Sequence, residues 1–407
     1  MIFWEIFKMA ANALRINRMR TILTLLGVII GVSSVITIIS ALDGLEQSIK
    51  SELEFLGPST FIATKMGIIM SDEDFFEALK RKPLKYEYVK AIEEGCDKCV
   101  KVAASSNAFN TEIKYRNNKL RNVLVRGSEY NIIEIIDFEL GQGRFFTHEE
   151  DLTRRRVAFI GTTIQDELFP GVDPIGKSLK INNVKYKVIG IAKKKGSSFG
   201  NDADRVIFIP YHTFVKQFGH PRGRLAIFVK ANSVEDVPDA MDQVRVILRA
   251  RRHVPYDKKD DFGMVTADAV MAVLNDITRF LRLGLVGISS IALIVGGIII
   301  MNIMMVSVTE RTREIGIRKS IGARQKDILL QFLYESLIQS LGGGLIGIAI
   351  GVILGKVLIS LMNFNMTPSV FAIVVGLTIS TGVGLFFGIY PAMKAAKMQP
   401  VKALSFE

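Results

Sequence analysis

Four long apolar stretches constrain the fold of this 407-residue chain more than any other feature of its sequence. A helix of about 20 apolar residues crosses the hydrocarbon core of a bilayer. Because 23% of the residues are charged and the mean hydropathy is still positive, very apolar segments must alternate with a polar domain. The predicted membrane spans are residues 22–42, 283–308, 333–361 and 370–390.

The segment between the first two spans, residues 43–282, has the composition of a soluble protein. Strand-like patterns gather at about 111–224, whereas helical patterns lie on both sides of them and next to the spans. The sequence therefore predicts an α-helical membrane protein with four spans and an extracytoplasmic α/β (α+β) domain of two subdomains. We expect the β-rich subdomain to be inserted in the α/β subdomain, with a stalk helix at each end.

The distribution of Lys and Arg predicts the side of the membrane that each loop occupies. Basic residues gather in three segments that flank the spans, residues 1–21, 309–332 and 391–407. Both termini and the 309–332 loop are therefore expected in the cytoplasm, and residues 43–282 outside. The uncharged loop 362–369 agrees with this assignment, whereas Arg279 and Arg282 oppose it.

The N-terminal segment 1–21 has polar residues three or four apart and apolar residues between them. This pattern predicts an amphipathic helix lying on the membrane, or simply the cytoplasmic start of the first span. The formal net charge of +12 is divided between such flanking segments and a domain of mixed charge, so nucleic acid is not an expected partner.

Small residues recur at every fourth position in three of the spans. Such rows let two helix backbones approach closely in lipid. We therefore expect the third and fourth spans to pack as a tight hairpin through their matched rows. The rows are Gly27 and Gly31 in the first span, Gly343, Gly347, Gly351 and Gly355 in the third, and Gly376, Ser380, Gly384 and Gly388 in the fourth.

The middle of each span lacks Asp, Glu and His, and Lys356 is near the end of its span. A carrier that is driven by protons or ions needs an ionisable group on its path. The energy for any transport is therefore expected to come from outside the spans.

Residues 171–178 match the phosphate-loop pattern GxxxxGK[ST]. That loop binds phosphate when a strand precedes it and a helix follows it. Here an aromatic residue and a proline precede the motif, and the residues after it alternate like a strand. We interpret the motif as a surface turn and expect no nucleotide or other cofactor on this chain.

Cys96 and Cys99 are the two cysteines of the chain, and both lie in the predicted outer domain. Two cysteines without suitably spaced histidines make a poor zinc site. A disulfide in an oxidising compartment is the first interpretation, and a free pair of thiols is the second. With no catalytic arrangement evident, the chain is expected not to be an enzyme.

Three segments resemble the permease domain of the MacB-type, or mechanotransmission, ABC transporters. They are Asn17 to Val32, a series of short motifs between Gly143 and Gly200, and Asn302 to Arg324, and the tail from Tyr390 to Leu404 also matches. The likeness covers essentially the whole chain. MacB carries an ATPase domain before the first span, whereas residues 1–21 alone precede it here, so the ATPase is expected to be a separate chain.

The resemblance implies a multi-pass protein of the inner or plasma membrane of a prokaryote, working as a homodimer or with a close paralogue. It also implies a cytoplasmic ABC ATPase subunit that holds ATP and Mg²⁺, and an extracytoplasmic adaptor protein. Such a permease drives export or extraction of a peptide, drug or lipoprotein. The alternative is an FtsX-like regulator, which transmits ATPase motion to a cell-wall hydrolase, but its outer domain is usually smaller.

The 309–332 loop is the expected contact with the ATPase. It is short and mixed in charge, and a helix of this kind can dock in a groove of a partner; an ordinary positive-inside loop is the alternative. The residues assigned to coupling are Glu310, Arg311, Arg313, Glu314, Ile315, Gly316, Ile317, Arg318, Lys319, Gly322, Ala323 and Arg324.

Overall fold

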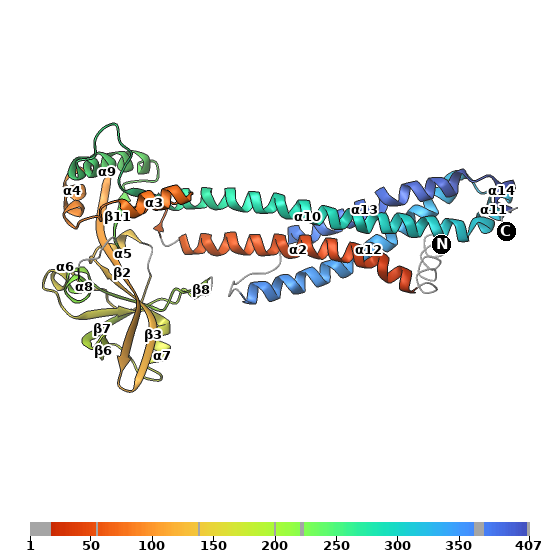
Figure 1. Cartoon of the computed structure of the whole chain (residues 1–407). Helices are drawn as coiled ribbons and strands as arrows, with labels where there is room; N and C mark the ends of the chain where they lie inside the picture. Colours follow the sequence, from red (N-terminus) through yellow and green to blue (C-terminus); the bar gives the residue numbers. More distant parts are fainter. Residues whose placement is uncertain are drawn as a thin grey trace. The chain divides into compact units, whose positions relative to one another are not determined.

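The computed structural model describes residues 18–53, 56–136, 139–198, 201–219, 224–361 and 370–404. Most of the predicted N-terminal helix and the whole loop 362–369 lie outside the described residues. The chain divides into two compact units (Figure 1). The membrane unit contains residues 1–47 and 276–407, and the outer unit contains residues 48–275.

The described part of the membrane unit is built on four helices that are long and apolar enough to cross a bilayer, which confirms the predicted architecture. They are α2 (Arg18–Leu53), α10 (Ala267–Glu310), α12 (Gln325–Leu361) and α13 (Val370–Lys397). Helices α2 and α10 extend beyond the predicted spans without a break. Each predicted stalk is therefore part of the same helix as its span. The short helices α11 (Thr312–Ser320) and α14 (Pro400–Leu404) complete this unit.

Apolar side chains from all four long helices form one core in the membrane unit. Val32 of α2, Met304 of α10, Phe332 of α12 and Ala372 of α13 are buried in it. Outside this core the helices expose many large apolar side chains, and burying them in lipid satisfies the hydrophobic effect as well as burying them in protein.

The outer unit is organised by a ten-stranded mixed sheet with the order β12-β1-β11-β2-β3-β10-β5-β7-β4, in which β6 pairs with both β2 and β7. The strands are β1 (Thr60–Thr64), β2 (Cys99–Tyr115), β3 (Asn118–Ser128), β4 (Leu140–Gly143), β5 (Val157–Ile160), β6 (Ser178–Ile181), β7 (Val184–Ala192), β10 (Val206–Pro210), β11 (Leu225–Ala231) and β12 (Gly263–Thr266). A separate two-stranded ribbon joins β8 (Ser197–Ser198) to β9 (Asn201–Asp202). The helices are α3 (Asp72–Lys80), α4 (Glu87–Gly95), α5 (Ile132–Ile135), α6 (His148–Leu152), α7 (Thr162–Leu168), α8 (Tyr211–Phe218) and α9 (Val237–Arg252).

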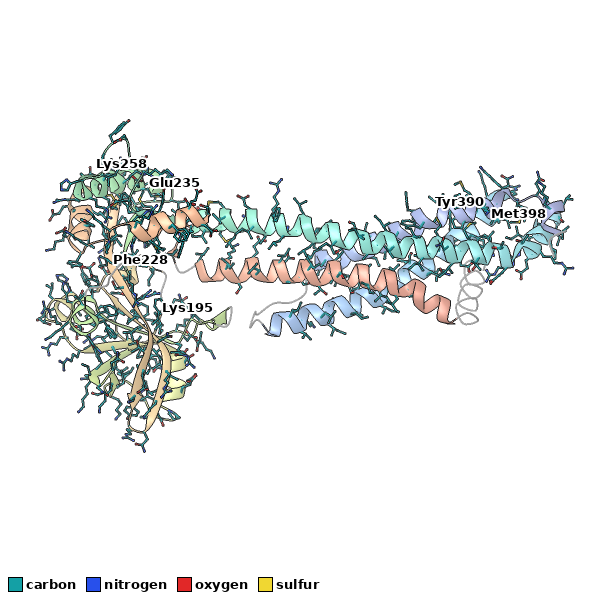
Figure 2. The ribbon with its side chains drawn as sticks, in the orientation of Figure 1. Lys195, Phe228, Glu235, Lys258, Tyr390 and Met398 are labelled. Atoms are coloured by element: carbon teal, nitrogen blue, oxygen red, sulfur yellow. A yellow bond between two sulfur atoms is a disulfide. The ribbon has the colours of Figure 1, made fainter. Side chains whose placement is uncertain are left out.

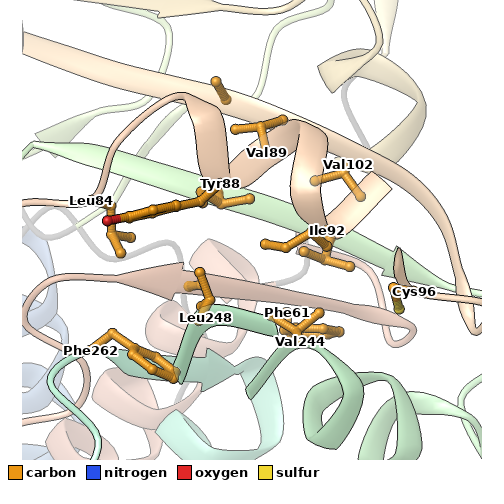
Figure 3. Close-up of a cluster of buried hydrophobic side chains, with 14 of the residues drawn as sticks. Phe61, Leu84, Tyr88, Val89, Ile92, Cys96, Val102, Val244, Leu248 and Phe262 are labelled. Carbon is orange, nitrogen blue, oxygen red and sulfur yellow. The ribbon is translucent and has the colours of Figure 1, made fainter. Parts of the chain in front are cut away.

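The α/β subdomain consists of β12, β1, β11 and the first part of β2, with α4 and α9 packed on the sheet. The buried residues of α9 recur every three or four positions, which is the spacing of one face of an amphipathic helix. Val244 and Leu248 of that face meet Phe61 of β1 and Tyr88 of α4 in one hydrophobic core (Figure 3).

The β-rich subdomain contains β3, β10, β5, β7 and β6 with α7 and α8, and it has a core of its own. The 17-residue strand β2 belongs to both subdomains, because its first part pairs with β11 and its second part with β3 and β6. The β-rich subdomain is thus continuous with the α/β subdomain through this shared strand.

Candidate functional site

The helix α11 occupies the middle of the predicted coupling loop, between the end of α10 and the start of α12. Gly322 turns the chain after it with φ +104°, a conformation that favours glycine. Asp327 then accepts a hydrogen bond from the backbone N–H of Arg324, at 3.0 Å, and so caps the start of α12. The conformation of the chain between α11 and α12 is thus fixed.

One face of α11 is buried against the membrane unit. Ile315 is 1% exposed and joins the core of the four long helices. Gly316 lies so close to α14 that a Cβ atom there would come within 2.8 Å of the Cβ of Ala403. A larger residue at Gly316 or at Ala403 would push α11 and α14 apart.

Polar contacts tie α11 to both of the following long helices. Arg311 pairs with Glu335 of α12 at 3.1 Å, and Arg318 donates to the side chain of Gln331, also in α12, at 2.9 Å. Lys319 donates to the backbone carbonyls of Ala396, near the end of α13, and of Met398 beyond it. Burial lowers the pKa of the Lys319 ammonium.

The opposite face of α11 is exposed. Arg313 and Glu314 lie there with Ile317, whose side chain is 45% exposed, and Ile321 follows at the end of the helix. Glu314 makes a loose ion pair with Arg318 at 3.6 Å, one helical turn away. An apolar centre with charges of both signs around it is the composition of a protein-docking surface.

The structure therefore divides the predicted coupling residues into two groups. Arg311, Ile315, Gly316, Arg318, Lys319 and Ala323 are buried or half-buried within the membrane unit. Glu310, Arg313, Glu314, Ile317, Gly322 and Arg324 are exposed. The first group fixes α11 to α12, α13 and α14, and the second is free to meet another molecule, except that Glu310 has a partner of its own.

Glu335 is the residue of this site that the sequence did not single out. It lies at the start of the predicted third span, is 5% exposed, and has the Arg311 guanidinium as its partner. The available signal was a lone acidic residue inside an apolar run. A carboxylate is rarely buried without a cationic partner, so a search for that partner in the adjacent basic loop would have led to Arg311.

The glycine rows pack helices closely, but the pairs differ from those expected from their spacing. Gly347 and Gly351 of α12 face α2, where a Cβ atom would come within 3.0 Å of the carbonyl oxygen of Ile29 and 2.9 Å of that of Ser33. Gly27 of α2 in turn faces Gly296 of α10. The α12 row therefore holds the third span against the first.

From Ser380 onward, the α13 row packs against a different face of α12, whereas Gly376 lies nearest to Ile36 of α2. Gly384 lies against Ser340 and Gly388 against Ser336, while Ser380 lies against Gly344. The third and fourth spans do pack together as expected, but the two predicted rows do not face each other. Serines of α12 take the place of glycines because a small side chain still allows a close approach.

Two sequence features of the outer unit have structural positions away from α11. The sulfur atoms of Cys96 and Cys99 are bonded, at the junction of α4 and β2. The phosphate-loop-like motif at 171–178 follows α7 and leads into strand β6, so no helix N-terminus is available there for phosphate. Among the described residues, no group of three or more His, Cys, Asp or Glu side chains is arranged to hold a metal ion.

A polar cluster lies where the two subdomains of the outer unit meet. Glu129 accepts hydrogen bonds from the Tyr86 hydroxyl at 2.5 Å and from the Ala104 backbone N–H at 2.6 Å. Nearby, His212 contacts the buried Asp151 carboxylate at 3.1 Å. Burial raises the pKa of Glu129, and the hydrogen bond with Asp151 raises the pKa of His212. The hydrogen bonds of Glu129 with Tyr86 and Ala104 connect the α/β subdomain to the β-rich one.

Comparison with known proteins places both units in described families. Residues 21–247 match the model of the MacB-like periplasmic core domain, and residues 286–400 match the FtsX-like permease C-terminal domain. The chain is 35% identical over 397 residues to "Macrolide export ATP-binding/permease protein MacB" of Bdellovibrio bacteriovorus, covering 97% of this chain and 61% of that protein. It is also 35% identical over 404 residues to the protein of the same name from Chlorobaculum tepidum, covering 98% of this chain and 61% of that one.

Among solved structures, the periplasmic region of MacB from Actinobacillus actinomycetemcomitans aligns with a TM-score of 0.46 and 16% identity. The alignment covers 55% of this chain and 95% of that one. The chain spans about three fifths of the length of the curated relatives, whose names include an ATP-binding part.

Proposed function

This chain belongs to the MacB-like family of membrane permeases, and on that basis we propose that it is the permease subunit of an ABC transporter. In this proposal a separate cytoplasmic ATPase chain holds ATP and Mg²⁺ and hydrolyses the nucleotide. The present chain converts that reaction into movement of its outer domain, which exports or extracts a substrate such as a peptide, a drug or a lipoprotein. It performs no catalysis itself.

The geometry of α11 is the observation that carries the proposal. A helix that transmits force needs a rigid attachment to the membrane helices and a free surface for the partner. On one side α11 is held by the Arg311–Glu335 pair and by the contact of Gly316 with Ala403. On the other side Glu314 and Ile317 are exposed, and they are the proposed contacts with the ATPase.

Movement of α11 would reach the outer domain through packed helices. The polar contacts of α11 pass displacement to α12 and to the end of α13. The displacement is then transmitted from α12 to α2. At the glycines the two backbones are in close contact, so no flexible side chain lies between them to absorb the movement. Finally, α2 and α10 run without a break from their membrane segments to the boundaries of the outer unit.

The proposed topology places both termini and α11 in the cytoplasm and the outer unit outside. The concentration of Lys and Arg in the segments 1–21, 309–332 and 391–407 supports this orientation. The proposed partners are the ABC ATPase, a second copy or a close paralogue of this chain, an extracytoplasmic adaptor protein and the lipid bilayer.

Two considerations support transport over regulation of a cell-wall hydrolase. The match to a MacB-like periplasmic core domain covers most of the outer unit. The relatives are also named for macrolide export, although their substrate is not thereby the substrate of this chain. An FtsX-like regulator remains the outcome to expect if the outer unit binds and activates a hydrolase.

Co-purification tests this proposal. The full chain, expressed with an ABC ATPase subunit from the same genome, is expected to form a stable complex in detergent that hydrolyses ATP. An Ile317→Asp variant should lose the ATPase, whereas Val172→Asp, an exposed apolar site of the outer unit, should retain it. Failure of the unaltered chain to bind any ABC ATPase would overturn the proposal.

A further inference from the structure

A row of directly paired residues crosses the outer sheet and contains one cation. Asn107 of β2 lies opposite Arg126 of β3. Arg126 in turn lies opposite Phe208 of β10, which lies opposite Phe159 of β5. Directly paired residues project from the same face of a sheet, so these side chains are neighbours. The two phenylalanines belong to a hydrophobic core that also contains Phe228 of β11 (Figure 2), and a guanidinium group therefore lies beside an aromatic core.

The guanidinium group of Arg126 is held in one orientation by its neighbours in the row. Its Nε atom donates a hydrogen bond to the side-chain oxygen of Asn107 at 3.1 Å. Its Cζ atom lies 5.4 Å from the centre of the Phe208 ring, which is a cation–π distance. The two Nη atoms have no partner among the described residues, and both remain in contact with solvent. They form the planar fork with which arginine binds a carboxylate or a phosphate at two points.

The surroundings of Arg126 supply no counter-charge. Among the described residues, no acidic side chain pairs with it. The positions two residues before and after Asn107, Arg126 and Phe208 share its face of the sheet, and they are Ser105, Phe109, Leu124, Ser128, Val206 and Pro210. Burial lowers the pKa of the Arg126 guanidinium to about 10, which leaves it charged at neutral pH. A half-buried cation is costly to keep without an anion, so the site is short of one.

The accessible surface next to Arg126 is apolar. Phe109, two residues beyond Asn107, is 62% exposed at a bulge in the pairing of β2 with β3. Leu124, two residues before Arg126, is half-buried and packs against the same core as Phe208. A small inorganic anion would leave this surface in water, whereas an organic anion covers it with its apolar part. The chemistry therefore favours an amphipathic anion.

The same face of the sheet meets the ends of the helices α2 and α10. Leu53, the last residue of α2, and Ala267, the first residue of α10, pack against the core that contains Phe208. All three residues belong to the outer unit. A ligand at Arg126 would thus lie on the face of the sheet at which the two long helices enter the outer unit.

We propose that Arg126 is the centre of a binding site for an amphipathic organic anion. The two Nη atoms bind the carboxylate or phosphate group of the ligand, and its apolar part lies over Leu124 and Phe109. Asn107 is a positioning residue, since it orients the guanidinium through its hydrogen bond with Nε. Two sources supply such an anion, a phospholipid or a soluble organic acid, and the fork binds both in the same way. The inference goes beyond the proposed function, because binding requires neither the ATPase nor transport.

Calorimetric titration of the full chain in a maltoside detergent measures this site with two probes, hexanoate and hexyl phosphate. Both are expected to bind, whereas acetate should bind about tenfold more weakly because it has no apolar part, and hexylammonium should not bind. Arg126→Met should weaken hexanoate binding tenfold or more, since the charged fork is lost. Arg116→Met is the matched control. The Arg116 guanidinium also lies 5.4 Å from an aromatic ring, that of Tyr115, but it is exposed in a turn, so its loss should leave binding unchanged.

Stability measurements separate a ligand site from a structural role for Arg126. Arg126→Met removes a half-buried charge that has no ion-pair partner in the described chain, so the denaturation midpoint should stay the same or rise. Arg126→Lys keeps the charge but not the fork. It should fold like the unaltered chain and bind hexanoate about fivefold more weakly. A lower midpoint for Arg126→Met, or undiminished binding by Arg126→Lys, would overturn the proposal.

Native mass spectrometry of the same samples distinguishes the two sources of the anion. A phospholipid that stays bound to the unaltered chain but is lost from Arg126→Met assigns the site to a lipid headgroup. Hexanoate binding without a retained lipid assigns it to a soluble acid, and either result supports the proposal. If the unaltered chain binds neither probe and retains no lipid, or if Arg126→Met binds as well as the unaltered chain, the proposal is wrong. Binding of the ATPase is measured separately, so none of these outcomes decides the proposed function.

Discussion

Breaking the Arg311–Glu335 pair is the perturbation that most sharply tests how α11 is held. In a Glu335→Gln variant the side chain keeps its shape and one neutral acceptor, but the Arg311 guanidinium loses its counter-charge. Glu335 is 5% exposed, so water does not replace the lost interaction at that end of the pair.

The expected magnitude follows from the burial of the two partners. Removing one member of a fully buried ion pair costs roughly 3–5 kcal/mol, because the remaining charge is left uncompensated. The Arg311 side chain is 31% exposed and can regain part of its hydration. We therefore expect Glu335→Gln to lower the free energy of unfolding by about 2 kcal/mol, below the range for full burial.

The assay is a reversible denaturant titration of the purified chain in detergent, followed by circular dichroism. Glu314→Gln is the matched control, since its exposed pair with Arg318 contributes at most about 0.5 kcal/mol. Exchanging the charges, with Arg311→Glu and Glu335→Arg together, should recover part of the loss. Equal effects of Glu335→Gln and Glu314→Gln would refute the reasoning.

Three simpler predictions concern the topology, the phosphate-loop-like turn and the glycine rows. A thiol reagent that cannot cross membranes should label Asn118→Cys but not Ser320→Cys in cells with a permeable outer layer, and reversed labelling would contradict the topology. Lys177→Ala should leave ATP hydrolysis by the assembled complex unchanged, because a strand follows the turn; loss of ATP binding with the fold intact would show that the turn holds nucleotide. Gly351→Leu should destabilise the chain by about 1–3 kcal/mol through overlap with α2, whereas Gly342→Leu points into open space and should have little effect; equal losses would refute the helix pairing.

The architecture was predictable because its signals are local. An apolar run of membrane length is visible in the sequence whatever the helix packs against. The strands and helices of the outer unit also follow local periodicity. The shared strand β2 was not predictable, because pairing with two different neighbours is a property of the folded sheet.

The helix pairs were less predictable than the helices. A row of small residues shows which face of α12 is approached closely, but it carries no information about which helix approaches. Gly347 and Gly351 meet α2, and the α13 row meets Ser336 and Ser340 instead. Matched spacing in two helices is thus compatible with two separate interfaces.

The position of the candidate site is itself a prediction from the sequence, whereas its internal division comes from the structure. Sequence alone placed coupling in the loop that contains α11, and Ile315 and Ile317 both looked available for a partner. Their opposite burial, 1% and 45% exposed, depends on the core of the long helices, in which Ile315 joins residues as distant in sequence as Ala396. A contact so distant in sequence leaves no periodic signal in the loop itself.

The central claim, that α11 is the surface through which the ATPase acts, is tested most directly by photocross-linking. Benzoylphenylalanine is incorporated at Ile317 of the full chain, co-expressed with the ABC ATPase, and the membranes are irradiated. The account predicts a product that contains both chains, and no such product when the same group replaces Asn118 in the outer unit. An intact permease–ATPase complex that gives no product from position 317 would contradict the claim.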